Sequence, residues 1–367
     1  MRYLYVCATP YQLLNILNMH MNAILYRDDK HVHTTLCIID IFPKTSDIAD
    51  NVSKLNIFNE VYVIPEEDRK SQKNGYRKYF SLAYDVLFPG RLIKQQFGTE
   101  RYNQLVHGYD AIIASVFSHT IAALRTVNRH AKLYMIDDGI GSYFGNSIKT
   151  MRSNDYLRLL RLRNRGINIA KVDALYLTQI EFSTSTLSDN VIQLPYISDT
   201  VIMTAKRIFL HQSAEELYNK QIIWLTQPIR TPALNKVSNQ ISQMLLSHKS
   251  SVVVRPHPRE KNRDNYVLYD IDKSNNMWEL MISDLQIDTK LLISYHSTAL
   301  FSPKLLYDKE PYLIFAYKLL NLSYNEMLEE IICKLRDIYK NKDRICVPDS
   351  FEEMESFIDK YIKKELD

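Results

Sequence analysis

Short apolar runs recur along the first half of the chain, and each ends at small or polar residues. These runs predict buried strands at 3–7, 34–40, 61–64, 111–116 and 133–136. Leucines on one face predict a helix from Tyr11 to about Tyr26, and the preceding Thr9 and Pro10 are typical of a helix start. Because helical stretches separate several of the strands, we expect an α/β fold with a parallel sheet.

The pattern restarts in the second half, after a polar and irregular stretch at about 150–200. Strands are expected at 222–225, 251–254, 291–294 and 312–315, with a helix at 234–246. Ser350 and Glu353 form a capping box that predicts a helix at the C-terminus. We therefore predict two doubly wound, Rossmann-like domains, at 1–190 and 191–367, which face each other across a central cleft.

The composition supports two compact domains and argues against several functions. The chain has 367 residues, and 46% hydrophobic against 24% charged residues excludes a disordered chain. The net charge of +4 comes without a long Lys/Arg run, so we expect no nucleic acid partner, whereas an anionic substrate fits. With no apolar run of about 18 residues and no visible signal peptide, we expect a cytoplasmic protein.

The first of three polar clusters is Asp137-Asp138-Gly139, directly after a predicted strand. In open α/β sheets, ligands bind beyond the carboxyl ends of the strands. A carboxylate there can take a proton from an attacking hydroxyl group, and repulsion between neighbouring carboxylates raises the pKa of one of them. The alternative is a turn whose aspartates only bind their own backbone.

The second cluster is Arg255-Pro256-His257-Pro258-Arg259, again after a strand. The prolines fix the loop, the arginines suit a phosphate, and a histidine beside a phosphate can donate a hydrogen bond or a proton. The alternative is a rigid surface loop with solvated arginines.

The third cluster is Ser294-Tyr295-His296-Ser297-Thr298. Hydroxyl groups and free N–H groups at a helix start make an anion site, and the alternative is an ordinary helix cap. Together the clusters suit transfer from a nucleotide sugar, with a base in one domain and a phosphate site in the other.

These clusters resemble the Asp-Asp-Gly, His-Pro and Ser-Ser/Thr motifs shared by several bacterial sialyltransferase families. The opening Cys7-Ala8-Thr9-Pro10-Tyr11-Gln12-Leu13-Leu14 resembles the start of glycosyltransferase family 52, which includes the lipooligosaccharide α-2,3-sialyltransferases. The resemblance implies a GT-B fold, an inverting mechanism without a metal, and CMP-sialic acid as the donor. It also implies a glycan acceptor, such as a galactose-terminated glycan of lipooligosaccharide or capsule.

The resemblance also assigns roles to individual residues. Asp137, or else Asp138, would be the base, and His257 the general acid or phosphate partner. Ser297 and Thr298 would bind the donor phosphate. The remaining donor-binding candidates are Gly139, Gln227, Arg255 and Pro258, and the acceptor-binding candidates are Thr9, Tyr11 and Gln12.

The chain departs from family 52 at one turn. Where a Gly-Ser-Pro-Asp turn is expected before the His-Pro motif, this chain has Thr226-Gln227-Pro228-Ile229, without the aspartate. Either the base lies in the acidic turn, or the acceptor and the chemistry differ.

Two further patterns allow functional interpretations. Asp270-Ile271-Asp272 resembles a metal-binding D-x-D, but no clear apolar strand precedes it, so we interpret it as a solvated loop and expect no metal. The arginines at 158, 161, 163 and 165 indicate either an exposed basic helix or a peripheral contact with the inner membrane. Homodimer formation is left open.

Two other functions remain open at this point. The same fold could serve a transferase for another nucleotide sugar, such as a glucosyl- or hexosaminyltransferase, or a non-catalytic nucleotide-binding component of a polysaccharide assembly complex.

Overall fold

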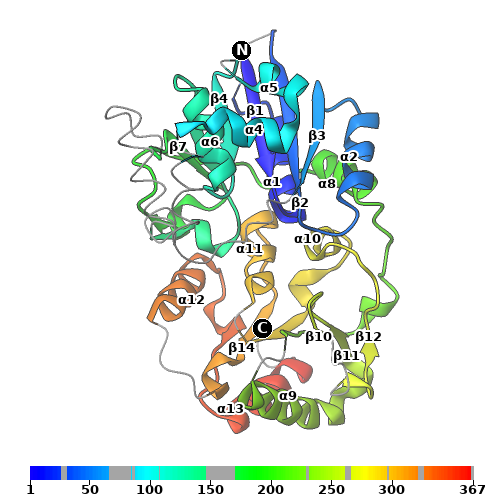
Figure 1. Ribbon diagram of the computed structural model, residues 1–367. Coiled ribbons are helices and arrows are strands. Elements are labelled where there is room, and N and C mark those ends of the chain that lie inside the picture. Colours follow the sequence, from blue (N-terminus) through cyan, green and yellow to red (C-terminus); the bar gives the residue numbers. More distant parts are fainter. Residues whose placement is uncertain are drawn as a thin grey trace. The chain divides into compact units, whose positions relative to one another are not determined.

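The computed structural model describes most of the chain and divides it into two compact units, Met1–Phe209 and Leu210–Asp367. The described residues are 1–25, 31–65, 84, 87–106, 108–145, 170–228, 231–260, 266–295, 297–320 and 326–364. Figure 1 labels most of the helices and strands, and the two units are taken one at a time. No described helix is long and apolar enough to cross a membrane.

The first unit is built on a parallel sheet with the strand order β3-β2-β1-β4-β5-β7-β9. Its strands are β1 (Arg2–Cys7), β2 (His33–Asp40), β3 (Glu60–Pro65), β4 (Ala111–Ala114), β5 (Lys132–Ile136), β7 (Ala174–Leu177) and β9 (Val191–Gln193). A separate pair joins β6 (Phe144–Gly145) and β8 (Thr184–Ser185). The helices are α1 (Pro10–Met21), α2 (Thr45–Lys54), α4 (Pro89–Phe97), α5 (Thr99–Leu105), α6 (His119–Val127) and α8 (Asp199–Ile208).

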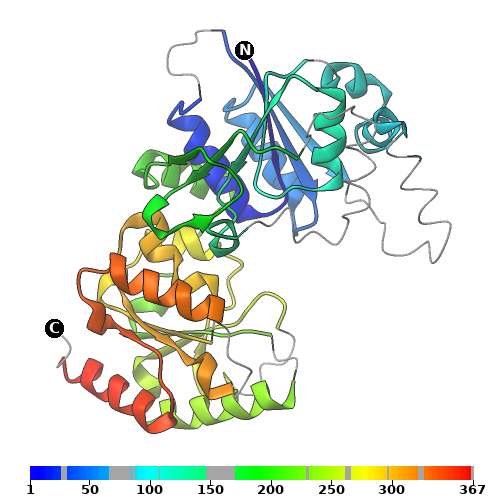
Figure 2. The ribbon, with the colours of Figure 1, turned by 90° about the vertical axis from the view of Figure 1, so that its left-hand side faces the viewer.

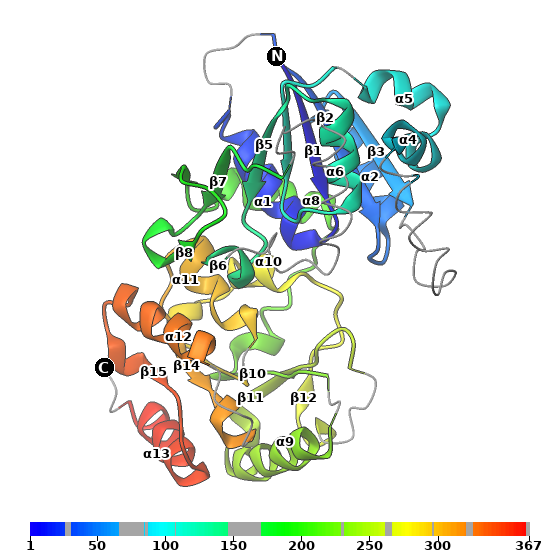
Figure 3. The same cartoon turned by 60° about the vertical axis from the view of Figure 1, so that its left-hand side comes forward.

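The helices cover a sheet whose central strands are almost wholly buried. Leu4, Leu36 and Ile112, from neighbouring strands, are 0% exposed. Helix α1 packs against β1 and α8, and α6 packs against β4 and α4; Figure 3 shows α6 along the strands of this sheet. Burial of both faces explains why these strands read as continuous apolar runs in the sequence.

The first unit departs from the sequence predictions at its end. The stretch at 150–200, expected to be irregular, contains β7 and β9, and β9 pairs with β7 at the edge of the first sheet. Helix α8 then packs against α1 and α2. Because these contacts hold residues 191–209 on the first unit, its boundary lies after Phe209 rather than at residue 190.

The second unit repeats the architecture with the strand order β12-β11-β10-β13-β14-β15, again with every described pair parallel. Its strands are β10 (Ile222–Leu225), β11 (Val252–Arg255), β12 (Asp270–Ile271), β13 (Leu291–Ser294), β14 (Tyr312–Phe315) and β15 (Ile345–Cys346). Its helices are α9 (Pro232–Leu245), α10 (Trp278–Ile282), α11 (Ser302–Tyr307), α12 (Glu326–Ile338) and α13 (Phe351–Ile362).

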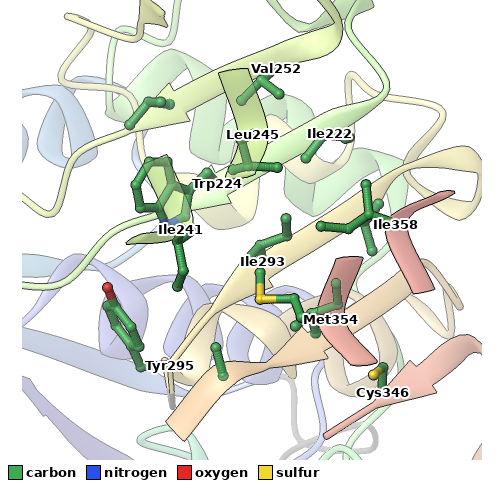
Figure 4. Close-up of a cluster of buried hydrophobic side chains, with 14 of the residues drawn as sticks. Ile222, Trp224, Ile241, Leu245, Val252, Ile293, Tyr295, Cys346, Met354 and Ile358 are labelled. Carbon is green, nitrogen blue, oxygen red and sulfur yellow. The ribbon is translucent and has the colours of Figure 1, made fainter. Parts of the chain in front are cut away.

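Two helices and the sheet share one core in the second unit. In Figure 2, α9 (light green) and α13 (red) both lie along the bottom of the second unit, and Ser350 caps α13 as the sequence predicts. Their apolar side chains gather with those of the strands in Figure 4, where the labelled members include Ile222, Trp224, Ile241, Leu245, Ile293, Met354 and Ile358. The ring of Trp224 meets that of Tyr266 edge to face, with centroids 5.0 Å apart.

In each sheet, the direction in which successive strands are added reverses once. This reversal marks the place where a ligand is expected. The chain runs from β1 through β2 to β3 on one side and then returns to β4 on the other side of β1. In the second unit, β13 returns on the other side of β10. Ligands of open α/β sheets bind beyond the carboxyl ends of the strands at such reversals. The predicted cleft between the two domains stays a prediction.

Candidate functional site

The acidic turn begins where β5 ends and buries its first carboxylate completely. Asp137 is 0% exposed. Its Oδ2 accepts a hydrogen bond from the hydroxyl of Tyr143 at 2.6 Å, and its Oδ1 accepts the N–H of Gly139 at 2.6 Å and the hydroxyl of Tyr11 at 3.3 Å. The turn requires a φ of +88° at residue 139, which glycine adopts without strain. Asp137 is therefore held from several sides.

The second carboxylate is held on one oxygen only. Asp138 is partly exposed, and its Oδ1 accepts the side-chain amide of Gln12 at 2.6 Å. Gln12 is in turn fixed by the N–H of Ala8, which donates to its Oε1 at 2.7 Å. The main-chain N–H of Asp138 donates to Ser142 Oγ at 2.8 Å. Among the described residues no hydrogen bond occupies Oδ2 of Asp138, so this oxygen can accept a proton.

Burial raises the pKa of both carboxyl groups. The pKa of Asp137 rises to about 7, mainly because burial disfavours the charged form, while the bonds from Tyr143 and Gly139 oppose the shift. The pKa of Asp138 rises to about 6 for the same main reason. The charge of Asp138 adds to the shift of Asp137 as a smaller cause, so desolvation outweighs the repulsion invoked from the sequence.

The three acceptor-binding candidates at the start of α1 support the turn and the helix. Thr9 Oγ1 caps the helix by accepting the N–H of Gln12 at 3.2 Å. Gln12 is 3% exposed and bound to Asp138, and the hydroxyl of Tyr11 reaches Asp137. These contacts place the segment beside the acidic turn, where Gln12 orients a carboxylate.

The His-Pro loop follows β11 and is fixed by main-chain contacts. The N–H of His257 donates to Thr226 Oγ1 at 3.2 Å, and its C=O accepts the N–H of Glu260 at 2.8 Å. The N–H of Arg259 donates to the ring Nδ1 of His257 at 3.0 Å. Since β10 and β11 are parallel neighbours, Thr226 and His257 leave the same edge of the sheet.

One sequence interpretation in the second unit needs correction. Asp272 lies directly after β12 and is 4% exposed, so the D-x-D is not a solvated loop. Its Oδ2 forms an ion pair with Arg255 and accepts the hydroxyl of Tyr218 at 2.7 Å. Arg255 also donates to the C=O of Asn276. The guanidinium is therefore engaged inside the unit and braces two loops, while its role in donor binding stays a prediction.

Apart from Gly139 in the acidic turn, the remaining donor-binding candidates lie at the same edge of the second sheet. Gln227 follows β10, and Ser297 follows β13, the strand on the other side of β10. Ser297 caps a short 3-10 turn by accepting the N–H of Ala299 at 3.2 Å, so the predicted helix start is irregular. Thr298 and Pro258 are exposed. His296, and the arginines at 158–165, lie outside the described residues.

Asn15 and Tyr143, which both contact Asp137, were not singled out from the sequence. Gln12, Asn15 and Asn18 are buried amides spaced three residues apart, on one face of an otherwise apolar helix. Asn15 donates to the main-chain oxygen of Asp137 at 3.1 Å. That spacing is a usable signal, because buried amides need partners. No comparable signal marks Tyr143.

The first unit also contains a cavity of about 610 Å³, at α4, α5 and α6. Its lining includes Tyr84, Arg91, Lys94, Tyr102 and Arg129, and none of the predicted site residues. The cavity is therefore separate from the candidate site residues.

The raised pKa of Asp137 predicts a pH-dependent stability. Its pKa of about 7 in the folded protein exceeds the ordinary value of 3.8, so folding favours the protonated form. Relative to Asp137→Asn, the wild type should lose stability as the pH rises from about 4 to about 7, by about 4 kcal/mol at most, since one pKa unit is worth about 1.36 kcal/mol. Denaturant unfolding of both proteins across this range measures the difference; a constant difference would contradict the assigned burial.

A structural role of Arg255 makes a separate prediction. Arg255→Met leaves the buried carboxylate of Asp272 without its cation and should cost about 3–5 kcal/mol of unfolding free energy. Adding Asp272→Asn removes the uncompensated charge and should recover part of this loss. The matched control is Arg259→Met, since Arg259 is exposed. Unchanged stability with a higher KM for the donor would instead favour donor binding.

Comparison with solved structures finds the same fold at low sequence identity. The glycotransferase of kitacinnamycin matches with a TM-score of 0.54 and 8% identity, covering 100% of this chain and 91% of that chain. A putative UDP-N-acetylglucosamine 2-epimerase from Listeria monocytogenes gives 0.52 and 10%, covering 99% and 88%. The spinosyn forosaminyltransferase SpnP gives 0.51 and 10%, covering 99% and 91%. These matches confirm the predicted GT-B fold of two Rossmann-like units.

Sequence comparison identifies the family. No curated protein matches the chain. The family model described as alpha-2,8-polysialyltransferase (POLYST) matches residues 3–314, which is most of the chain. The broader prediction of a sialyltransferase family is thereby confirmed, while membership of glycosyltransferase family 52 stays a prediction. The chain belongs to the alpha-2,8-polysialyltransferase family.

Proposed function

We propose that the protein transfers sialic acid from CMP-sialic acid to a hydroxyl group of a glycan, with inversion at the anomeric carbon. One observation carries the proposal: the family match over residues 3–314 includes both the acidic turn and the His-Pro loop. Each follows the carboxyl end of a strand in its own parallel sheet, which is where ligands of open α/β sheets usually bind. Fold alone cannot select the reaction, because an epimerase shares it.

The family name supports an acceptor that ends in sialic acid, joined through an α-2,8 linkage. The resemblance of the opening segment to family 52 supports instead a galactose-terminated glycan of lipooligosaccharide or capsule. The family match spans far more of the chain than the opening segment, so we propose the sialic-acid-terminated acceptor first.

The contacts favour Asp138 over Asp137 as the base. Both oxygens of Asp137 already accept hydrogen bonds inside the first unit, and its side chain is 0% exposed. Asp138 is partly exposed, and Gln12 holds its Oδ1. A pKa of about 6 leaves Asp138 ionised at pH 7.5 and more basic than an ordinary aspartate. Asp137 would support the turn.

The proposed step moves one proton and exchanges one bond. The acceptor hydroxyl gives its proton to Asp138, and its oxygen forms a bond to the anomeric carbon of sialic acid. The bond from that carbon to the phosphate oxygen of CMP breaks, and the electron pair leaves with the phosphate. His257 donates a hydrogen bond to the phosphate, with Ser297 and Thr298 as further donors from the same sheet edge.

A donor and acceptor panel tests the function. The protein is incubated with CMP-sialic acid and with glycans that end in sialic acid, galactose or glucose, and each product is identified by mass spectrometry. We expect the glycan that ends in sialic acid to be extended. Extension of the galactose glycan alone would favour the family 52 assignment. Turnover of a UDP-sugar instead, or binding of CMP without any transfer, would overturn the proposal. We also propose that no metal takes part, so activity should persist in EDTA.

The assignment of the base predicts different effects for two matched variants. Asp138→Asn removes the proton acceptor and should lower kcat by about 10²–10⁴. Asp137→Asn keeps one oxygen to accept the N–H of Gly139, and its amide group can donate to the hydroxyl of Tyr143, so this variant should lower kcat by less than about tenfold at pH 7.5. Steady-state kinetics with CMP-sialic acid, with unfolding curves as the folding control, separate the two. A larger loss in Asp137→Asn would identify Asp137 as the base.

We further propose that the protein works on the cytoplasmic side, close to the inner membrane. The arginines at 158–165 would supply the contact, as expected from the sequence. Sedimentation with anionic vesicles, compared with neutral ones, tests this contact.

A further inference from the structure

One hydrogen bond determines which ring nitrogen of neutral His257 carries the proton. The main-chain N–H of Arg259 donates to His257 Nδ1 at 3.0 Å. A main-chain N–H can only donate, so Nδ1 must accept and carries no proton while this bond lasts. A neutral imidazole carries one proton, which is then on Nε2. In this state the ring carries its N–H at Nε2 and has no positive charge.

The main chain of the same residue is fixed from two sides. Thr226 Oγ1 accepts the N–H of His257, and the hydroxyl of Thr226 donates in turn to Glu260 Oε2. Tyr266 donates to the other oxygen of Glu260 at 2.9 Å. Thr226 and Glu260 are 4% and 5% exposed, so this chain of hydrogen bonds is shielded from water. Such shielding strengthens hydrogen bonds and limits movement of the loop.

The leaving group of the proposed reaction needs no proton. A phosphate monoester has its second pKa near 6, so CMP leaves as a dianion at pH 7.5. What the departing oxygen requires is a placed hydrogen-bond donor, and removing one such donor typically costs about 10²–10³ in kcat. A neutral Nε2–H supplies this bond.

We propose that Thr226 and the main-chain amide of Arg259 are positioning groups, which hold His257 as a neutral Nε2–H donor to the leaving phosphate. This inference rests on the proposed function. His257 gives up no proton: the only proton transfer is from the acceptor hydroxyl to the base, and the electron pair of the broken bond stays on the phosphate oxygen. The histidine acts as a phosphate partner and not as a general acid.

Nitrogen-15 NMR of the full chain tests the tautomer directly. The ring signals of His257, assigned by their loss in His257→Ala, should show a neutral ring protonated on Nε2 at pH 7.5. An imidazolium, or a ring protonated on Nδ1, would overturn the proposal. This readout requires no turnover. If the tautomer is found but CMP-sialic acid is not used, the proposed function fails while the positioning stands.

Two pairs of variants test the positioning groups. Thr226→Ser keeps the hydroxyl group and should retain the wild-type kcat. Thr226→Val removes the hydroxyl group and should lower kcat about tenfold to a hundredfold, with little change in the KM for CMP-sialic acid. Arg259→Ala keeps the main-chain amide and should preserve the Nε2–H signal, whereas Arg259→Pro deletes that donor and should shift the tautomer.

The outcomes separate positioning from mere stability. Unfolding curves identify any variant that fails to fold, and the Thr226 pair remains informative if Arg259→Pro distorts the loop. Equal kcat in Thr226→Val and Thr226→Ser would overturn the role of the threonine. An unchanged tautomer in a folded Arg259→Pro protein would overturn the role of the amide.

Discussion

Parallel pairing is the constraint on which both candidate sites depend. When every strand runs in one direction, all carboxyl ends meet at one edge, so residues far apart in sequence leave the sheet side by side. Thr226 and His257 are brought together in this way by β10 and β11. The acidic turn after β5 and the start of α1 after β1 meet likewise at the edge of the first sheet. The apolar strands thus determine where the polar residues of the loops that follow them lie.

The two units hold their proposed functional side chains in a similar way. In each, a side chain with proposed chemistry is held by a polar group that is itself buried: Gln12 for Asp138, and Thr226 for His257. A buried hydrogen bond is stronger than an exposed one, and an unpaired buried group is costly, so both arrangements resist distortion. Desolvation also raises the pKa of Asp138 towards neutrality. Rigidity and basicity therefore arise from the same burial.

Most of the fold, but only part of the two candidate sites, could be predicted from the sequence. Strands such as 222–225 and 291–294 were predicted to the residue, because continuous apolar runs between polar ends leave little choice. Strand β9 was missed because its three residues form no apolar run, and only pairing with β7 defines it. Strand β7 was missed although Ala174–Leu177 is an apolar run as long as β10, because it lies within a largely polar stretch. Side-chain partners were harder still. Nothing local shows that Arg255 forms an ion pair with Asp272, since that contact depends on how two loops fold.

The chemistry of the leaving group explains why a neutral histidine suits this loop. An imidazolium would attract the developing charge more strongly, but its Nδ1 would carry a proton and could not accept the main-chain N–H of Arg259, so the loop as folded fits the neutral ring. A fixed Nε2–H bond strengthens as negative charge develops on the leaving oxygen, so it favours the transition state over the bound donor. The amide of Arg259 secures this choice without any further charged side chain, because a main-chain N–H cannot change its role with pH. The loop geometry, rather than the identity of the histidine alone, would then determine what the histidine does.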